Sequence, residues 1–570
     1  IKFTNSSVDA TFDENGNYTG GSILEYVTVE YAGFGEIKGA VETDQASLFV
    51  NQATIRNNQA TGLYVIGGTN QVISNSTFSH NRSSVIGMKS FGEPSDVFGI
   101  HVQDVDATIS GNTVTYNNNG IKTQTSSTTP VISLENNTIS WNGGTLSWQG
   151  IPGNAGLWLV GHGPVTVSNN TFSDNDTRTG AIVLWSGQDK IISNNVIHQN
   201  FAREMAAGGI NVGHLWDTGY GSGTALISGN TITDNIGDGK AGGIWVRKWA
   251  TITNNIFSGN YTVDQVNRTL AISIGGGATI TGNTFSNHSG SDGSSLLSDH
   301  TGAYLPVIIT DNNFINNTVP YLAYAGTSKS MDAQNNWWGT TSASEIQTLI
   351  YDWNDESTKG VVDDTPFLTD PNTTAPPSPP SGVAAQTGPT SIAFSWTANP
   401  EADITGYKLH YDTDAAGYPY ANSVDLGDVT SYTLSSLTNG ATYYSAISAY
   451  DGDGNESWYS EDVSTTTQST PVKLAFTTQP SDGTTGSDIS TQPAVSTQDL
   501  EGTTFTSSSS TVTLSITSDS GTNGATLIGT SSVATVNGVA IFTDLRINTS
   551  GDDYTLTATA TGLTSAISSS

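Results

Sequence analysis

The first 340 residues repeat one short pattern of apolar and polar positions. An apolar–polar alternation leads into Gly-Asn or Asn-Asn and continues as a second alternating run that ends in Asn. The pattern stands in ISGNTVTYN (109–117), LENNTISWN (134–142), VSNNTFSDN (167–175), IISNNVIHQN (191–200), ISGNTITDN (227–235) and ITNNIFSGN (252–260). Alternation with a period of two predicts short β-strands, and none of these units contains a helical pattern.

The spacing of the repeat predicts a coiled arrangement of these strands. Equivalent asparagines follow one another at steps as short as 24 residues, which at about 3.3 Å per strand residue is one circuit of a flattened coil with three faces. The sequence therefore predicts a parallel β-helix. Coils stacked about 4.8 Å apart would let the amide of each asparagine bond to the next one, as a structural ladder. The predicted ladder consists of Asn112, Asn137, Asn170, Asn195, Asn230, Asn255, Asn283, Asn312 and Asn336.

A second recurring element is a strand of the form Gly-apolar-x-apolar, as in GLYV, GIHV, GLWL and GIWV. Alternation places x on the outside of the coil, and this predicts one exposed column. The column consists of Tyr64, His101, Lys122, Trp158, Val183, Asn211, Trp245 and Ser273, and the next outward position adds Gln103, Gln124, Trp185 and Arg247. Aromatic faces with amides beside them suit the rings and hydroxyls of a polysaccharide. We therefore predict glycan contact at Tyr64, Trp158, Trp185 and Trp245; the alternative is that these rings pack beneath inserted loops.

Catalytic chemistry on the same face is the rival hypothesis. A lyase would need a cation and a base, for which the candidates are His101, Lys122, His214, Asp217 and Arg247. A hydrolase would need two nearby carboxylates, and Asp189, Glu204 and Asp217 do not recur in one column. Lys122 and Arg247 are five coils apart by the repeat count. The enzyme assignment is therefore left open, with the balance against it.

The repeat ends in AQNNWWGT (333–340), followed by SASEIQTLIYDW. Ser342 and Glu345 have the spacing of a capping box, and one helical face carries Ile346, Leu349, Ile350 and Trp353, so a short helix should cover the last coil. With VVDDTPFLTDP (361–371), this region resembles right-handed parallel β-helix proteins of the pectin-lyase-like superfold. That resemblance covers residues 1–371 and implies the fold only, because lyases, hydrolases, tailspikes and adhesins share it.

One tripeptide has its own resemblance. Gly161-His162-Gly163 is similar to the GHG element of polygalacturonases, but the NTD and paired-Asp elements that precede it in that family are missing here. We therefore expect the match to be a coincidence.

The proline-rich stretch at 372–380 predicts an extended linker. After it, Trp396 in IAFSW, Tyr407 in ITGYKLHY and the passage YTLSSLTNGATYY resemble a fibronectin type III domain, assigned to 381–468. Residues 469–570 resemble the Ig-like repeats of large bacterial surface proteins. The expected fold class is all-β, with a right-handed parallel β-helix at 1–371 and a helical cap, followed by two β-sandwich domains.

Composition narrows the partners. The formal net charge of −33 repels nucleic acid and anionic lipid. The absence of cysteine excludes disulfides and thiolate metal sites. No apolar run is long enough to insert in a membrane. Calcium is a possible cofactor at Asp451, Asp453 and Asn455, whose alternate oxygens resemble the start of an EF-hand loop, although a solvated turn fits them as well.

These observations favour an extracellular or cell-surface protein with a structural or adhesive role. In this hypothesis a rigid β-helix stands on an Ig-like stalk, can self-assemble into a filament or surface layer, and binds a polysaccharide or cell-surface glycan. The alternative function is a secreted polysaccharide lyase or glycoside hydrolase of the same superfold.

Overall fold

The computed structural model describes all residues of the chain except 33–37, 83–96, 144–154, 186–188, 205, 214–223, 264–268, 292, 300–304, 469 and 500–501. Two compact units are present. The first contains 1–381, 398–408 and 447–460, and the second contains 382–397, 409–446 and 461–570.

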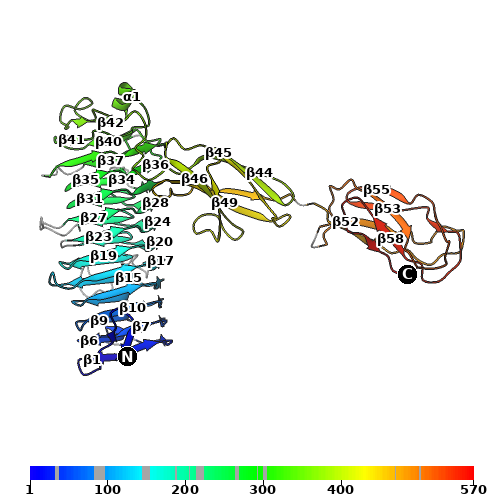
Figure 1. Ribbon diagram of the computed structural model, residues 1–570, viewed down its shortest axis with the longest axis horizontal. Coiled ribbons are helices and arrows are strands. Elements are labelled where there is room, and N and C mark those ends of the chain that lie inside the picture. The colour runs from blue at the N-terminus through cyan, green and yellow to red at the C-terminus, as the bar shows by residue number, and fades with distance from the viewer. Residues whose placement is uncertain are drawn as a thin grey trace. The chain divides into compact units, whose positions relative to one another are not determined.

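The N-terminal part of the first unit is a parallel β-helix built from three long sheets, whose strands succeed one another from coil to coil (Figure 1). A short fourth parallel sheet consists of β21 (Asp176–Thr177), β25 (Phe201–Ala202), β29 (Ile236–Gly237) and β33 (Tyr261–Thr262) in four consecutive coils. The first sheet, in the described residues, consists of β1 (Lys2–Thr4), β6 (Gly39–Asp44), β9 (Thr61–Ile66), β12 (Phe98–Gln103), β15 (Asn119–Thr125), β18 (Leu157–Gly161), β22 (Ile182–Leu184), β26 (Ile210–Val212), β30 (Ile244–Val246), β34 (Thr269–Ile274), β37 (Ser295–Asp299), β40 (Tyr321–Ala325) and β42 (Ile350–Tyr351). All of these strands pair in parallel, as coils of one hand require.

The second sheet, over the same described ranges, consists of β4 (Ile23–Glu25), β7 (Phe49–Asn51), β10 (Gln71–Ser74), β13 (Ala107–Ser110), β16 (Ile132–Glu135), β19 (Val165–Ser168), β23 (Lys190–Ser193), β27 (Ala225–Ser228), β31 (Trp249–Thr253), β35 (Gly277–Thr281), β38 (Val307–Thr310), β41 (Met331–Asp332) and β43 (Val362–Asp363). The third sheet consists of β5 (Thr28–Glu30), β8 (Thr54–Arg56), β11 (Thr77–Ser79), β14 (Thr113–Thr115), β17 (Thr138–Ser140), β20 (Thr171–Ser173), β24 (Val196–His198), β28 (Thr231–Thr233), β32 (Ile256–Ser258), β36 (Thr284–Ser286) and β39 (Asn313–Ile315). The expected coil with three faces is therefore present.

The core of the β-helix is a column of inward side chains repeated in each coil. Phe257 and Phe285 stack with their ring centroids 4.7 Å apart, Phe285 stacks on Phe314 at 5.3 Å, and Phe314 stacks on Trp338 at 5.0 Å. All four side chains are buried. Because parallel coils are in register, rings at equivalent positions of the repeat lie directly above one another and stack.

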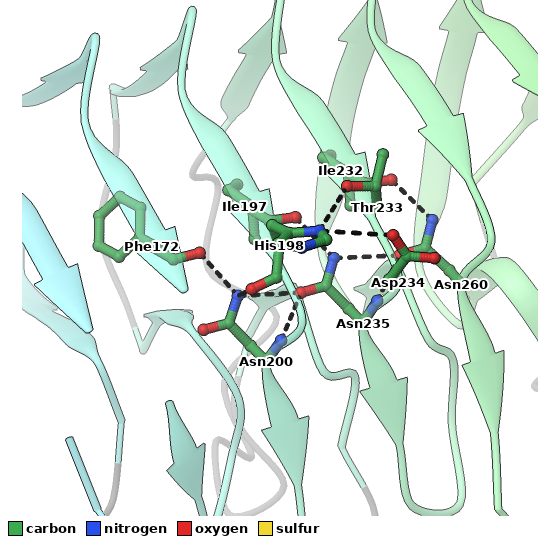
Figure 2. Close-up of polar contacts among 9 residues, drawn as sticks. All are labelled: Phe172, Ile197, His198, Asn200, Ile232, Thr233, Asp234, Asn235 and Asn260. Atoms are coloured by element: carbon green, nitrogen blue, oxygen red, sulfur yellow. Dashed lines mark hydrogen bonds and ion pairs between the residues drawn. The ribbon is translucent and has the colours of Figure 1, made fainter. Parts of the chain in front are cut away.

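Two asparagine ladders join the coils at two successive turns. The first asparagine ladder follows the second sheet, and its nine predicted members form one continuous chain of amide-to-amide hydrogen bonds from Asn112 to Asn336. The second asparagine ladder follows the third sheet and consists of Asn58, Asn81, Asn117, Asn142, Asn175, Asn200, Asn235 and Asn260. Figure 2 shows part of the second ladder: Asn200 donates to Asn235, and Asn235 donates to Asn260.

The last coil is covered by the helix α1 (Ala343–Thr348), with Ser342 as its N-cap. Ile346 enters the core as expected. The predicted helical face is wrong beyond Thr348, because Ile350 and Tyr351 form β42 and pair with the free edge of β40. Pairing with that edge satisfies the backbone groups of Ile350 and Tyr351 better than another helical turn would. As a result, Trp353 is 53% exposed instead of packing on the last coil.

The proline-rich stretch belongs to the first unit. Asn372 and Asn313 exchange two hydrogen bonds, from the Asn372 backbone to the Asn313 side chain at 2.7 Å and back from the Asn313 amide at 2.9 Å. Thr284 donates its hydroxyl to the carbonyl of Pro376. The stretch is thus held along the end of the third sheet.

The named strands of the C-terminal third, from Ser381 onward, form antiparallel sheets. In the fibronectin-like region, β44 (Ser381–Thr387), β45 (Ser391–Thr397) and β48 (Ser431–Ser435) form one sheet, and β46 (Ile404–Asp412), β47 (Asn422–Gly427), β49 (Thr442–Asp451) and β50 (Val463–Thr466) form the other. The last region has one sheet of β51 (Lys473–Thr478), β52 (Ala494–Gln498) and β56 (Val539–Ile541), and another of β53 (Thr511–Ile516), β55 (Ser532–Ala534), β58 (Leu556–Thr559) and β59 (Ala566–Ile567).

Candidate functional site

The outward column predicted on the first sheet lies in one register. The pairing runs Tyr64, His101, Lys122, Trp158, Val183, Asn211, Trp245 and Ser273, each directly opposite the next. Gln103 and Gln124 are paired in the neighbouring column. The alternation in the sequence therefore identified which side chains leave the coil on this face.

The expected exposure of this column is wrong for most of its members. Tyr64, His101, Asn211 and Ser273 are buried, and Trp245 is only 6% exposed because it packs with Ala207 and Ala241. Trp158 and Trp185 are half-buried. Alternation distinguishes inside from outside of a coil, but it says nothing of what covers the outside.

In the half-buried part of the column, the aromatic rings contact one another and the ammonium group of Lys122. The Nζ of Lys122 lies 5.0 Å from the ring centroid of Trp158 and 5.6 Å from that of Phe98. Trp158 contacts Trp185 at 5.2 Å between centroids, and the Tyr64 ring meets His101 edge-on at 4.8 Å. Cation–π and ring–ring contacts thus occupy the faces that a sugar would need.

His101 is a poor acid or base in this setting. Burial lowers the pKa of His101 to about 3, and the positive charges of Lys122 and Lys38 add to the shift. The imidazole is therefore neutral at ordinary pH and has little tendency to take up a proton.

The other catalytic candidates are not brought together. Lys122 and Arg247 are four coils apart instead of the expected five, since the strand pairing passes from β15 through β18, β22 and β26 to β30. At about 4.8 Å per coil this is still near 19 Å, too far for both groups to act on one bond. His214 and Asp217 lie outside the described residues. Glu204 is paired with Arg178.

The GHG tripeptide is accounted for by backbone geometry. Gly161 has a φ of +101°, and a Cβ there would lie 1.8 Å from the carbonyl oxygen of Thr125. His162 between the glycines is exposed. A residue that the sequence analysis missed lies close by: Lys190 occupies an inward position of the repeat, donates to the carbonyl of Gly163, and has its pKa lowered by burial to about 8.

The loop proposed for calcium uses its carboxylate internally. Asp451 is buried and accepts hydrogen bonds from the backbone of Asp453 at 3.0 Å, from the backbone of Asn455 at 2.8 Å and from the Asn455 amide at 2.7 Å. Asp13 makes the same pattern with Asn15 and Asn17. Both are self-contained Asx turns. The described residues contain no group of three or more acidic or histidine side chains placed to hold a metal ion.

The exposed aromatic surface lies elsewhere, at the turn after the third sheet. His80, Tyr116 and Trp141 follow the paired strands β11, β14 and β17 in three consecutive coils, and we call them the aromatic stack. The His80 and Tyr116 rings are 5.0 Å apart and 19° from parallel, and those of Tyr116 and Trp141 are 6.1 Å apart and 14° from parallel. Tyr116 is 41% exposed and Trp141 is 52% exposed.

The local backbone explains why these three side chains face solvent. Each directly precedes a buried member of the second ladder, namely Asn81, Asn117 and Asn142. Each also has a positive φ of 55–57°, which turns the chain sharply between strand and ladder. The same position holds Asn57 in the coil before His80 and Asp174 in the coil after Trp141, so the run of adjacent rings is three coils long. A sequence search for the residue before the last asparagine of each repeat would have found them.

The comparisons with known proteins agree with the architecture. Residues 98–269 match the family described as right handed beta helix region, and residues 378–466 match the fibronectin type III domain. The chain therefore contains a right-handed parallel β-helix region and a fibronectin type III domain. Among the described residues, the chain has no helix with the length and apolar character needed to cross a membrane.

Curated relatives match only parts of the chain. An alpha-amylase of Niallia circulans is 34% identical over 120 residues, which is 20% of this chain and 8% of the amylase. Exoglucanase B of Cellulomonas fimi is 34% identical over 114 residues, 20% of this chain and 9% of that protein. Among solved structures, the FN5 domain of Drosophila Lar has 23% identity and a TM-score of 0.14, covering 16% of this chain and 99% of that domain. The chain thus spans a small fraction of the curated relatives it matches.

Proposed function

We propose that this protein is an extracellular, cell-surface structural or adhesive protein that holds a polysaccharide along the aromatic stack. The observation that carries the proposal is the set of three nearly parallel rings, two of them at least 41% exposed, in consecutive coils. A single exposed ring is common on a protein surface, whereas a contiguous exposed apolar patch marks an interaction site or a ligand-binding groove. A sugar presents an apolar face to such rings, and its hydroxyls remain free for solvent or side chains.

The scaffold supports this role because it is rigid where the rings emerge. Asn117 and Asn142 anchor the backbone directly after Tyr116 and Trp141, with an amide-to-amide hydrogen bond of 3.1 Å between them. A fixed platform loses little side-chain entropy when a ligand binds. The names of the amylase and exoglucanase relatives point in the same direction, since both act on carbohydrate. In this proposal residues 1–371 form the binding scaffold and 381–468 and 469–570 form a fibronectin type III and an Ig-like stalk.

The test is affinity electrophoresis of the protein through gels that contain single polysaccharides, neutral and acidic. Trp141→Ala should weaken retardation by about tenfold, equivalent to roughly 1.4 kcal/mol. Trp353→Ala is the matched control, because Trp353 is equally exposed but lies far along the chain, after α1. Equal loss in both variants, or retardation by no polysaccharide, would contradict the proposed function.

A further inference from the structure

The aromatic stack lies beside two arginines in a chain that is strongly acidic. The protein has 18 Lys and Arg residues against 51 Asp and Glu. Arg82 donates from its Nε to the carbonyl oxygen of Tyr116 at 2.8 Å, so its guanidinium is fixed next to the rings. Arg56 lies in the coil before that of His80 and is paired with Ser79, the residue that directly precedes His80. Burial lowers the pKa of His80, and the positive charges of Arg82 and Arg56 lower it further.

Arg82 differs from four other arginines of the described residues, each of which is paired with a carboxylate. Arg56 bonds to Glu30, Arg178 to Glu204, Arg203 to Asp176 and Arg546 to Asp488. No carboxylate of the described residues pairs with Arg82, and its bond to Tyr116 uses only Nε. A guanidinium has five N–H donors in a fork that fits a carboxylate, so Arg82 keeps donors available for an external anion.

We infer that the polysaccharide bound along the aromatic stack carries carboxylates, and that Arg82 binds them while Tyr116 and Trp141 contact the sugar rings. This inference rests on the proposed function and adds the chemical class of the ligand. Thr113 and Thr138 are paired, exposed positions in the strands that lead into Tyr116 and Trp141, so the surface before the rings also carries hydroxyl groups. Arg56 contributes less, because Glu30 already neutralises it.

The experiment compares two ligands that differ only in charge. The probes are a hexamer of β-1,4-linked glucuronate and the glucose hexamer of the same linkage, titrated calorimetrically into the full chain at low and high salt. The glucuronate hexamer should bind at least tenfold more tightly at low salt, and the difference should shrink as salt screens the charge. Arg82→Gln should abolish most of that difference and leave affinity for the glucose hexamer unchanged. Arg56→Gln should have a smaller effect.

Arg546→Gln is the control for a general loss of positive charge, and it should change neither affinity. Equal binding of the two hexamers would overturn the inference, and so would an Arg82→Gln variant that still prefers the glucuronate hexamer. The proposed function would still hold in either case if binding depended on Trp141. If neither hexamer nor any polysaccharide in the gels bound in a Trp141-dependent way, the proposed function and the inference would both fall. Melting temperatures of the variants identify any loss that comes from misfolding.

Discussion

The side-chain amide of Asn195 donates to the Oδ1 of Asn230, 35 residues later in the chain, at 2.9 Å. The same amide also donates to the carbonyls of Val167 and Ser193, both at 2.9 Å. One side chain therefore joins three successive coils. Because Asn195 and Asn230 are buried, each of these bonds replaces a bond to water that the folded chain cannot make.

Replacing Asn195 or Asn230 with Leu should lower the free energy of unfolding by about 1–3 kcal/mol, because the carbonyls that they satisfy would be stranded. Asn422 is exposed at the start of β47, and Asn422→Leu should change stability by less than about 0.5 kcal/mol. Urea unfolding of the three variants provides the comparison. Equal midpoints would mean that the first ladder contributes nothing to stability.

The stacked phenylalanine rings in the core of the β-helix allow a second test of stability. Phe285 lies between Phe257 at 4.7 Å and Phe314 at 5.3 Å, and it is buried. Phe285→Ala should cost about 3–5 kcal/mol, since it removes both the buried area and the contacts with two rings. Trp353→Ala removes a larger but exposed side chain and should cost little. A small effect of Phe285→Ala in thermal unfolding would show that neighbouring coils collapse into the cavity.

Acid should destabilise the β-helix because of the buried side chain of His288. In the coil after Asn260, the last member of the second ladder, His288 occupies the position that asparagine holds in the earlier coils. Burial lowers the pKa of His288 from 6.5 to about 4, although its Nδ1 lies 3.2 Å from the Oδ1 of Asn317. The unfolded chain therefore binds this proton at a higher pH than the folded chain does. Stability should be fully present above about pH 6.5, fall as the pH drops toward 4, and level off below that, by up to roughly 3 kcal/mol for this group.

His288→Asn should flatten part of that acid slope in urea unfolding followed from pH 7 to 4. The pKa of His101 is lowered to about 3 by burial, so His101 should keep part of the slope in the variant. An unchanged slope would contradict the assignment to His288.

Tryptophan fluorescence should separate the exposed rings from the buried ones. Trp141 and Trp353 are 52% and 53% exposed, whereas Trp245 is 6% exposed. Acrylamide quenching of the whole chain should therefore fall when Trp141 or Trp353 is changed to Phe, and should hardly change for Trp245→Phe. The opposite ranking would return the glycan surface to the first sheet.

The protein should not cleave the polysaccharides that it binds. Lys122 and Arg247 are four coils apart, and His101 is neutral and buried, so we expect no new reducing or unsaturated ends from polysaccharides that the protein binds. Chromatography of overnight digests would detect them. Depolymerisation that disappears in Lys122→Ala would favour the polysaccharide lyase instead.

The repeat in the sequence determined the coil, the order of strands and the register of the first ladder. This was possible because a parallel β-helix stacks each residue on its equivalent in the next coil, so one-dimensional periodicity maps directly onto contacts such as His101 with Lys122. The fibronectin type III domain could also be recognised from the sequence, because core positions of β45 such as Phe394 and Trp396 alternate with exposed ones.

Which outward side chains meet water was decided only by the tertiary structure. Trp245 and Trp141 both leave their coils, yet Ala207 and Ala241 cover the first and nothing comparable covers the second among the described residues. Burial of that kind depends on residues from other turns of the coil, whose separation along the chain carries no periodic signature. The sequence therefore specified the scaffold, and the packing between its turns placed the exposed rings and Arg82 together.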